Sequence, residues 1–534
     1  MTATQAPQEA PPTAMTNRQI LQAMSGLMAG MFVAILAGTV VANALPTIIA
    51  DLEASQSSYT WVVTAELLAM TATVPLWGKL SDLFDKKLLL QLSLGMFVVG
   101  SLLAGFSHDV ELLILSRVVQ GIGAGGLTAL AQVVMAAIIP PRRLGKYASV
   151  FGAVFAIGTV AGPLVGGVLV DTSWLGWRWC FFIGVPFALL AIALLQRTLR
   201  LPAVARREAK IDFLGAFLIV AGVCALLIWV TLAGNEFDWA SWQTAALTGA
   251  GVLLLVAAVF VEARTAEPVI PLGIFRNRTV TLTTVASLLV GVAMFGGTVF
   301  LSQYFQVSLG KSPTVAGLMS LPMILGLLVS STVAGQVISK TGVWKRYLVA
   351  GAVIMTVGLG LLSTIDADTS FTLLSAYMAV LGIGVGMLMQ NLVLAAQNDV
   401  PASELGAATS VLSFFRSMGG TIGTSVLGAI LANRVASEMT KGLDAAGIPA
   451  GGDGGGENSV PDMSTLPEPV RQIVEHAYGV ATADLFLIAT PCALLALLTV
   501  VFIKEKPLKT TSGMERLAEE AATATETDKT VVGS

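Results

Sequence analysis

Apolar segments long enough to cross a membrane follow one another along almost the whole chain, and they limit the fold to an all-α integral membrane protein. A spanning helix needs about 20 apolar residues. Charged residues make up only 12% of the chain, against about 25% in soluble domains, so a water-exposed surface has too little polar material. We predict about fourteen spans, which lie near residues 22–49, 58–80, 88–107, 112–138, 148–170, 178–196, 211–233, 244–262, 280–306, 316–338, 347–365, 372–397, 405–433 and 483–503.

Lysine and arginine gather in every second loop between these spans. If the N-terminus lies in the cytoplasm, the tails and loops on that side hold 23 of the 30 basic residues, and the outer loops hold only five. Cytoplasmic loops carry the basic excess in membrane proteins. We therefore predict a multi-pass protein of the cell membrane with both termini in the cytoplasm.

The two halves of the chain repeat one pattern, in which a glycine near a helix end is followed by a turn and a basic pair. The pattern occurs at 78–87 and again at 335–346. Weak internal symmetry of this kind is typical of transporters built from repeated bundles. The predicted organisation is a disordered tail over 1–20, a six-helix bundle over 21–200, an inserted pair of spans over 201–279, a second six-helix bundle over 280–504 with an external loop at 434–482, and a cytoplasmic tail over 505–534.

A glycine-rich segment, G-T-V-A-G-P-L-V-G-G, occupies the fifth predicted span. Its glycines share one helix face, which lets a second helix approach closely in lipid. Pro163 removes a backbone donor and predicts a kink. Two interpretations fit this segment. One is general helix packing in a membrane, and the other is the hinge of an exporter. We expect the hinge to let this helix slide against its neighbour in the other bundle. The residues of the predicted hinge are Gly158, Gly162, Pro163, Gly166 and Gly167.

In their order along the chain, these motifs resemble the major facilitator superfamily, specifically its fourteen-span drug:proton antiporter branch. The resemblance covers about residues 20–505 and implies two six-helix bundles plus two inserted helices. It also implies that a loop latches the bundles on the cytoplasmic side, and that the glycine-rich fifth helix belongs to an exporter. The matching loop residues are Gly78, Leu80, Ser81, Asp82, Lys86 and Lys87, and we assign the latch to Gly78, Asp82, Lys86 and Lys87.

The fourth span carries a further match at Arg117, Gln120 and Gly121, and the resemblance implies that Arg117 takes part in proton transfer. Two positions depart from the family pattern. Asp85 stands where the loop usually has glycine, and Ala37 stands where the first helix often has an aspartate that is a candidate proton carrier.

Three ionisable residues lie inside predicted spans, where a charge is expensive without a partner or a water-lined cavity: Glu66, Arg117 and Arg416. Glu66 falls roughly 12 Å and Arg117 roughly 8 Å below the outer ends of their spans, and Asn43 lies at a similar depth. We hypothesise that Glu66 pairs with Arg117 and carries the proton. The alternatives are a static salt bridge, a Glu66 that reaches the outer interface, and an Arg117 that clamps two helices. Arg416 is assigned to proton coupling too, with substrate contact and support of a helix kink as alternatives.

The substrate cavity is expected near the midplane between the bundles. Polar and polarisable side chains are candidates for its lining, although ordinary bonding between helices explains each of them equally well. The candidates are Asn43, Gln303, Tyr304, Gln306, Met387, Gln390 and Asn391.

The predicted function is proton-coupled secondary-active efflux of amphipathic small molecules, often cationic or neutral, by alternating access. The chain has no phosphate-binding loop for ATP, no metal-ligand spacing and cysteines only inside apolar runs. We therefore expect no enzyme activity, no metal and no cofactor besides the proton gradient. The expected partners are substrate, protons and lipid, without nucleic acid, and the monomer is the favoured state. Two alternatives stay open, which are an exporter of lipids or cell-envelope precursors and a membrane sensor or scaffold that transports nothing.

Overall fold

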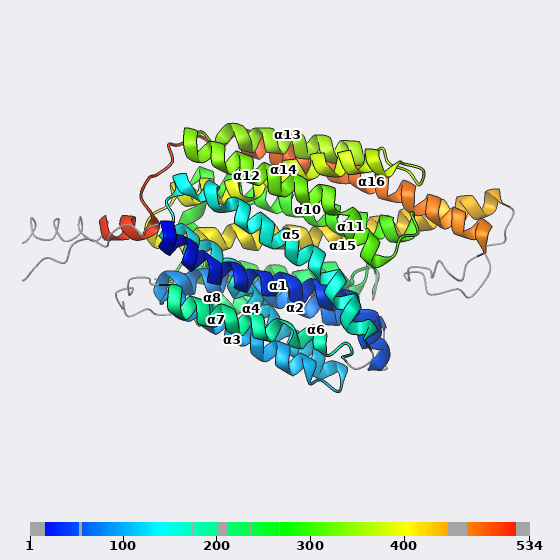
Figure 1. The fold of residues 1–534 in the computed structure, drawn as a ribbon, viewed down its shortest axis with the longest axis horizontal. Coiled ribbons are helices and arrows are strands. Elements are labelled where there is room, and N and C mark those ends of the chain that lie inside the picture. Colours follow the sequence, from blue (N-terminus) through cyan, green and yellow to red (C-terminus); the bar gives the residue numbers. More distant parts are fainter. Residues whose placement is uncertain are drawn as a thin grey trace, which may run out of the picture.

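The computed structural model describes residues 17–52, 56–172, 175–199, 212–234, 237–265, 267–446 and 467–519. Within them, regular secondary structure is helical apart from one isolated β-bridge between Ala233 and Phe237. The helices form two bundles that run roughly side by side (Figure 1). We call the end of the molecule where α1 begins and α2 and α16 end, on the left in Figure 1, the latch end.

The first bundle contains the helices α1 (Asn17–Asp51), α2 (Gln56–Leu83), α3 (Lys86–Gly105), α4 (Val110–Ile138), α5 (Pro141–Asp171), α6 (Trp179–Phe182) and α7 (Gly184–Thr198). The second contains α10 (Arg278–Val307), α11 (Pro313–Met319), α12 (Leu321–Thr341), α13 (Lys345–Leu362), α14 (Phe371–Asp399), α15 (Leu405–Ala445) and α16 (Glu468–Val501). Between them in sequence lie α8 (Phe213–Leu232), α9 (Trp242–Glu262) and the short η1 (Leu272–Arg276), and η2 (Ala402–Glu404) precedes α15.

Twelve helical segments in the described ranges are long and apolar enough to cross a membrane. They take α6 with α7 as one span and α11 with α12 as another. The helices α5 and α15 are 31 and 41 residues long and pack inside the two bundles, which gives the fourteen predicted spans. The all-helical fold with two bundles is therefore as predicted.

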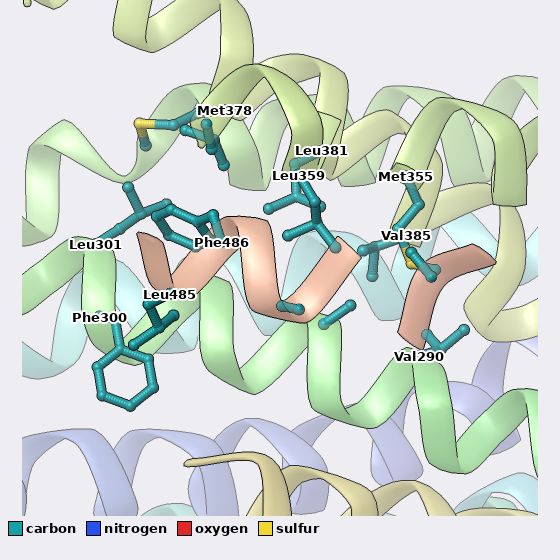
Figure 2. Close-up of a cluster of buried hydrophobic side chains, with 14 of the residues drawn as sticks. Val290, Phe300, Leu301, Met355, Leu359, Met378, Leu381, Val385, Leu485 and Phe486 are labelled. Carbon is teal, nitrogen blue, oxygen red and sulfur yellow. The ribbon is translucent and has the colours of Figure 1, made fainter. Parts of the chain in front are cut away.

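Each bundle has its own apolar core. In the second bundle, side chains from α10, α13, α14 and α16 interlock, and Figure 2 shows Phe300, Leu359 and Phe486 among them. The bundles meet along two pairs of helices, α5 with α12 and α2 with α15. The helices α8 and α9 pack chiefly on each other, and α8 also contacts both α2 and α15. The inserted pair thus covers one seam between the bundles.

Two helices are longer than predicted, which shortens the external loop expected at 434–482. The helix α15 continues to Ala445, and α16 already begins at Glu468. Ion pairs one turn apart support both extensions, including Lys441 with Glu438 at 2.7 Å. The two extensions also pack on each other where Gly442 meets Ile473. Residues 447–466 of the predicted loop lie outside the described residues.

The structure describes the first part of the predicted tail over 505–534. Residues 505–519 pack against the latch end, and Leu508 belongs to the apolar core of the second bundle. The remainder of that tail and residues 1–16 lie outside the described part of the chain.

The crossing of α10 and α15 yields a prediction about stability. A Cβ atom at Gly419 would lie 2.0 Å from the carbonyl oxygen of Leu288. We expect Gly419→Ala to destabilise the fold by about 1–3 kcal/mol, because the helices must move apart. Melting of the purified protein in detergent measures the effect. Gly360→Ala on α13 is the control, because nothing lies within 4 Å of its Cβ position. Equal melting temperatures for the two variants would contradict this prediction.

Candidate functional site

A cavity of about 280 Å³ lies between the two bundles. The first bundle lines it with α1, α2 and α4, and the second with α10, α12, α14 and α15. The polar lining residues are Thr39, Glu66, Thr128, Gln132, Ser331, Gln390, Arg416 and Ser417. The larger apolar ones are Met31, Ile35, Leu67, Met70, Met294, Phe295, Leu327 and Met389.

Glu66 on α2 and Arg117 on α4 form an ion pair at the wall of this cavity. The two residues are 7% and 2% exposed. Arg117 lies deeper, where its Nη1 donates to Gln120 Oε1 at 2.7 Å and its Nε donates to the carbonyl of Val62 at 3.3 Å. The pair exists because α2 and α4 touch. A Cβ at Gly121 would lie only 2.4 Å from the carbonyl oxygen of Glu66.

A buried ion pair of this kind holds its two charges together strongly. Removing one partner typically costs 3–5 kcal/mol, because the other charge stays buried without compensation. Gln120 is itself fixed, since its Nε2 donates to Ser101 Oγ at 3.0 Å. Arg117 therefore keeps neutral acceptors around it, whereas the carboxylate of Glu66 borders the cavity. Glu66 is the member of the pair that the cavity contents reach.

Arg416 contributes the other charge on the cavity wall. It lies on α15, is 7% exposed and borders the same space as Glu66. Its side chain forms no hydrogen bond or ion pair with another residue in the described ranges. The cavity thus brings together two of the three ionisable residues singled out in the spans, with the third directly behind.

Asp82 joins the bundles at the latch end. Its two carboxylate oxygens accept the backbone N–H groups of Gly406 and Ala407, each at 2.9 Å. These are orphan donors of the first turn of α15, and a negative charge is favourable there. The helices come close because Gly78 and Gly406 lack side chains, and a Cβ at Gly406 would meet the carbonyl oxygen of Gly78 at 2.6 Å.

The sequence model of the family described as Major Facilitator Superfamily matches residues 27–424. The chain belongs to this superfamily. Two relatives come from Bacillus subtilis: the multidrug transporter protein MdtP, 34% identical over 79% of this chain and 77% of its own, and multidrug resistance protein 3, 30% identical over 92% and 97%. An uncharacterized MFS-type transporter of Mycobacterium tuberculosis is 35% identical over 91% of this chain and 69% of its own.

Solved structures agree with the fold of the superfamily. The match to the proton:xylose symporter XylE covers 94% of this chain and 99% of the XylE chain, with a TM-score of 0.60 and 16% sequence identity. The match to the human organic anion transporter MFSD10 covers 91% of this chain and the whole MFSD10 chain, with a TM-score of 0.58 and 13% sequence identity. Membership of the superfamily and the apolar helices make the chain a multi-pass membrane transporter.

Several residues predicted to line this cavity lie elsewhere in the fold, and among the candidates whose side chains the structure describes only Gln390 borders it. Tyr304 is fully buried and donates from its hydroxyl to the carbonyl of Asp366 at 2.6 Å. Gln306 bonds within its own helix to Ser302. These polar side chains are satisfied by the protein itself, so their place in the cavity was wrongly predicted.

The other cavity candidates show how narrow the lining face of each helix is. Met387 faces α13, where it meets Gly351, and Gln303 does not border the cavity. Asn391 is 4% exposed and donates to the carbonyl of Met387 at 2.7 Å. It borders a second, small hollow between the bundles with Gln132. The side chain of Asn43 lies outside the described part of the structure.

Sequence reasoning missed five polar residues of the cavity, which are Thr39, Thr128, Gln132, Ser331 and Ser417. Gln132 carried the clearest signal, because an amide in the middle of an apolar span needs a hydrogen-bonding partner or a cavity. The small hydroxyl residues carried none, since they bond to their own helix at little cost.

The rest of the predicted latch has separate roles. Lys86 interacts electrostatically with Asp82, whereas Lys87 donates from its Nζ to the carbonyl of Gln196 at the end of α7, 2.8 Å away. Asp85 replaces the glycine of the family pattern and caps α3, accepting the N–H of Lys87 at 2.7 Å. Aspartate is a favoured N-cap residue, which explains its presence at this turn.

The glycines of α5 pack differently from the expectation. A Cβ at Gly158 would meet Ile35, and one at Gly162 would meet Thr39, so both face α1 in the same bundle. Thr39 Oγ1 also donates to the carbonyl of Gly158 at 3.2 Å. The expected sliding contact with the other bundle is therefore wrong for these two glycines, although α5 as a whole does contact α12. Gly166 is buried, Gly167 has open space at its Cβ position, and the side chain of Pro163 is not described.

The geometry of Asp82 predicts the behaviour of one variant. In Asp82→Asn the charge at the start of α15 is lost, and one amide group points an N–H at a backbone donor. We expect the contact between α2 and α15 to weaken by about 1–3 kcal/mol. Ser410 lies against Gly78 and Ser81 lies against Gly406, so cross-linking of cysteines placed at Ser81 and Ser410 reports how often the latch end opens. Asp85→Asn is the matched control, because that acid caps α3 within one bundle. An unchanged cross-linking rate in Asp82→Asn would refute the role.

Proposed function

We propose that this transporter exports amphipathic small molecules across the cell membrane in exchange for protons. The observation that supports this proposal most strongly is the Glu66–Arg117 pair at the wall of the cavity between the bundles. A carboxylate there meets both the contents of the cavity and a fixed positive charge. It is the one acid on the cavity wall among the residues that the structure describes.

Protonation of Glu66 changes the energy of this wall. In the charged state, Arg117 neutralises the carboxylate. When a proton binds, the carboxyl becomes neutral and Arg117 depends on Gln120 and the carbonyl of Val62. A ligand in the cavity that alters the surroundings of Glu66 therefore alters its affinity for the proton. By linkage, the proton alters the affinity for the ligand by the same factor.

The direction of transport in this proposal depends on the orientation of the protein in the membrane, which the distribution of basic residues indicates. With the latch end facing the cytoplasm, 23 of the 30 basic residues lie on the cytoplasmic side. A proton from outside then reaches Glu66 while the latch end is closed, and it leaves to the cytoplasm after the bundles have rocked. Cargo moves in the opposite direction through the same cavity.

Two further observations favour export. The glycine-rich segment of α5 resembles that of exporters, and its helix lies at the interface with α12. The two relatives from Bacillus subtilis bear the names multidrug transporter and multidrug resistance protein. The cavity itself is mostly apolar with scattered polar groups, which suits amphipathic ligands of varied shape.

A Glu66→Gln variant tests the coupling. In proteoliposomes that contain a pH-sensitive dye, we expect a panel of amphipathic compounds to drive proton movement through the natural protein. Glu66→Gln should lower that proton movement at least tenfold, because glutamine does not titrate. Glu111→Gln, an exposed acid in the first turn of α4, is the control. Proton-linked transport at the natural rate in Glu66→Gln would remove Glu66 from the mechanism.

A further inference from the structure

The charges of the cavity do not balance. Glu66 and Arg416 are its ionisable lining residues in the described chain, and Arg117 neutralises Glu66 from behind. Arg416 has no such partner among the described residues. A cavity with one matched acid and one unmatched base carries a positive charge.

An unmatched guanidinium at the depth of the lipid core is costly, and proteins retain one where a ligand or water meets it. The guanidinium of arginine is planar and binds carboxylate, sulfonate or phosphate oxygens through parallel N–H groups. Ser417, Ser331 and Gln390 line the same cavity and add neutral polar groups. Met294 and Phe295 on α10 offer an apolar surface in the same cavity.

We propose that the cavity binds amphipathic anions, with the acidic group on Arg416 and the apolar body against methionine and phenylalanine side chains. This inference rests on the proposed function only in that the ligand is also the cargo. It revises the expectation of cationic substrates. An organic cation would meet Arg416 and would find the carboxylate of Glu66 already paired.

Three probes of nearly equal shape test the charge preference: naphthalene-2-sulfonate, 2-naphthol and (2-naphthyl)trimethylammonium. Their binding to the purified protein in nanodiscs is measured by isothermal titration. We expect the sulfonate to bind at least tenfold more tightly than the ammonium compound. Arg416→Gln should lose at least tenfold in affinity for the sulfonate and change little for the naphthol. Arg416→Lys keeps the charge and should retain part of the preference.

The control is Arg434→Gln on the same helix, which removes an exposed arginine outside the cavity. Tighter binding of the ammonium compound by the natural protein would overturn the proposal, as would sulfonate affinity unaffected by Arg416→Gln and Arg416→Lys. Binding is measured without a gradient. Preferred sulfonate binding without proton-linked transport would therefore count against the proposed function and in favour of the anion site.

A second, independent inference concerns residues 504–519, which follow α16 and cross the latch end. On the second bundle they close two helix ends. Glu505 Oε1 accepts the N–H groups of Trp344 and Lys345 at the start of α13, at 2.8 and 3.1 Å. Arg516, 6% exposed, donates to the carbonyls of Gln397 and Val400 at the end of α14. An acid at a helix start and a base at a helix end both match the helix dipole.

Asn398 fixes the middle of this segment. Its Nδ2 donates to the carbonyl of Pro507 at 3.0 Å, and its Oδ1 accepts the N–H of Lys509 at 2.8 Å. Lys506 also pairs with Asp399. Side chains and backbone of the segment are thus held along the last turn of α14, so the segment is built as part of the second bundle.

The contacts with the first bundle are fewer and of another kind. The N–H of Arg142 donates to the carbonyl of Lys509 at 3.3 Å, and Gly513 lies against Ala136 and Ala137 at the end of α4. Met514 packs on the apolar cluster of the first bundle. Thr510 faces a hollow that it shares with Arg143. These contacts are mostly van der Waals packing, which separates at little polar cost.

We infer that residues 504–519 form a strap that moves with the second bundle and closes the latch end against the α4–α5 corner of the first. Opening of the latch end then breaks the contacts at Arg142, Gly513 and Met514 and keeps those at Glu505, Asn398 and Arg516.

Two cysteine pairs distinguish these sets of contacts, in a protein whose Cys180, Cys224 and Cys492 are replaced by serine. Arg143→Cys with Thr510→Cys joins the strap to the first bundle, and Asp399→Cys with Lys506→Cys joins it to the second. Both are linked by a short bis-methanethiosulfonate reagent that a reductant cleaves. We expect the first link to lower turnover in vesicles at least tenfold and reversibly, and the second to leave at least half of it.

Unchanged turnover with the first link complete would overturn the strap, and equal loss from both links would show that the strap also leaves the second bundle. Spin labels at Arg143 and Lys340 give a readout independent of transport. The distance between the labels is short when the latch end is closed and long when it is open. Because Arg516→Gln loosens the strap, we expect this variant to populate the long distance about fivefold more than the natural protein. A distance distribution unchanged by Arg516→Gln would contradict the inference. If vesicles transport none of the probes, that result would count against the proposed function and leave the spin-label test of the strap valid.

Discussion

A charge inside lipid needs a partner or a water-lined cavity, and this constraint brings two helices of the first bundle together. Glu66 and Arg117 satisfy it by pairing across α2 and α4, and the pair requires that the two backbones touch at Gly121. A side chain at that position would push Glu66 away from Arg117. Close packing of small residues is common between membrane helices. At Gly121 it allows an ionisable group to lie in the cavity wall.

The helix α2 connects this pair with the latch. Glu66 and Asp82 are 16 residues apart on it, about 24 Å along the axis. The middle of the helix borders the cavity, and its C-terminal end holds the N-terminus of α15 through Asp82. A change in the fit of α2 near Glu66 reaches the contact at Asp82 along the same helix, through the turn that contains Pro75. The inserted helix α8 lies against both α2 and α15 and covers the seam where that movement occurs.

Much of the fold was predictable because lipid admits few solutions. Apolar length identified the spans, and matched depth brought Glu66 and Arg117 together. Depth says nothing about the direction in which a side chain points, and this is why Tyr304 and Met387 were misplaced: each faces its own bundle, where a carbonyl or a glycine receives it. The strap escaped prediction for a related reason. Residues 504–519 read as a polar tail, and the groups that they satisfy, the open ends of α13 and α14, become visible only when the helices are assembled.

The helix α15 is the partner of α2 across the interface between the bundles. Its first turn is held by Asp82, and Arg416 follows Gly406 by ten residues, about 15 Å further along. Loss of the Asp82 contact frees the helix that carries the unmatched charge of the cavity. A ligand anion on Arg416 and a carboxylate on the first turn of α15 thus act on one rigid element from two points. In the proposed mechanism, binding in the cavity and closure at the latch end are joined through this single helix.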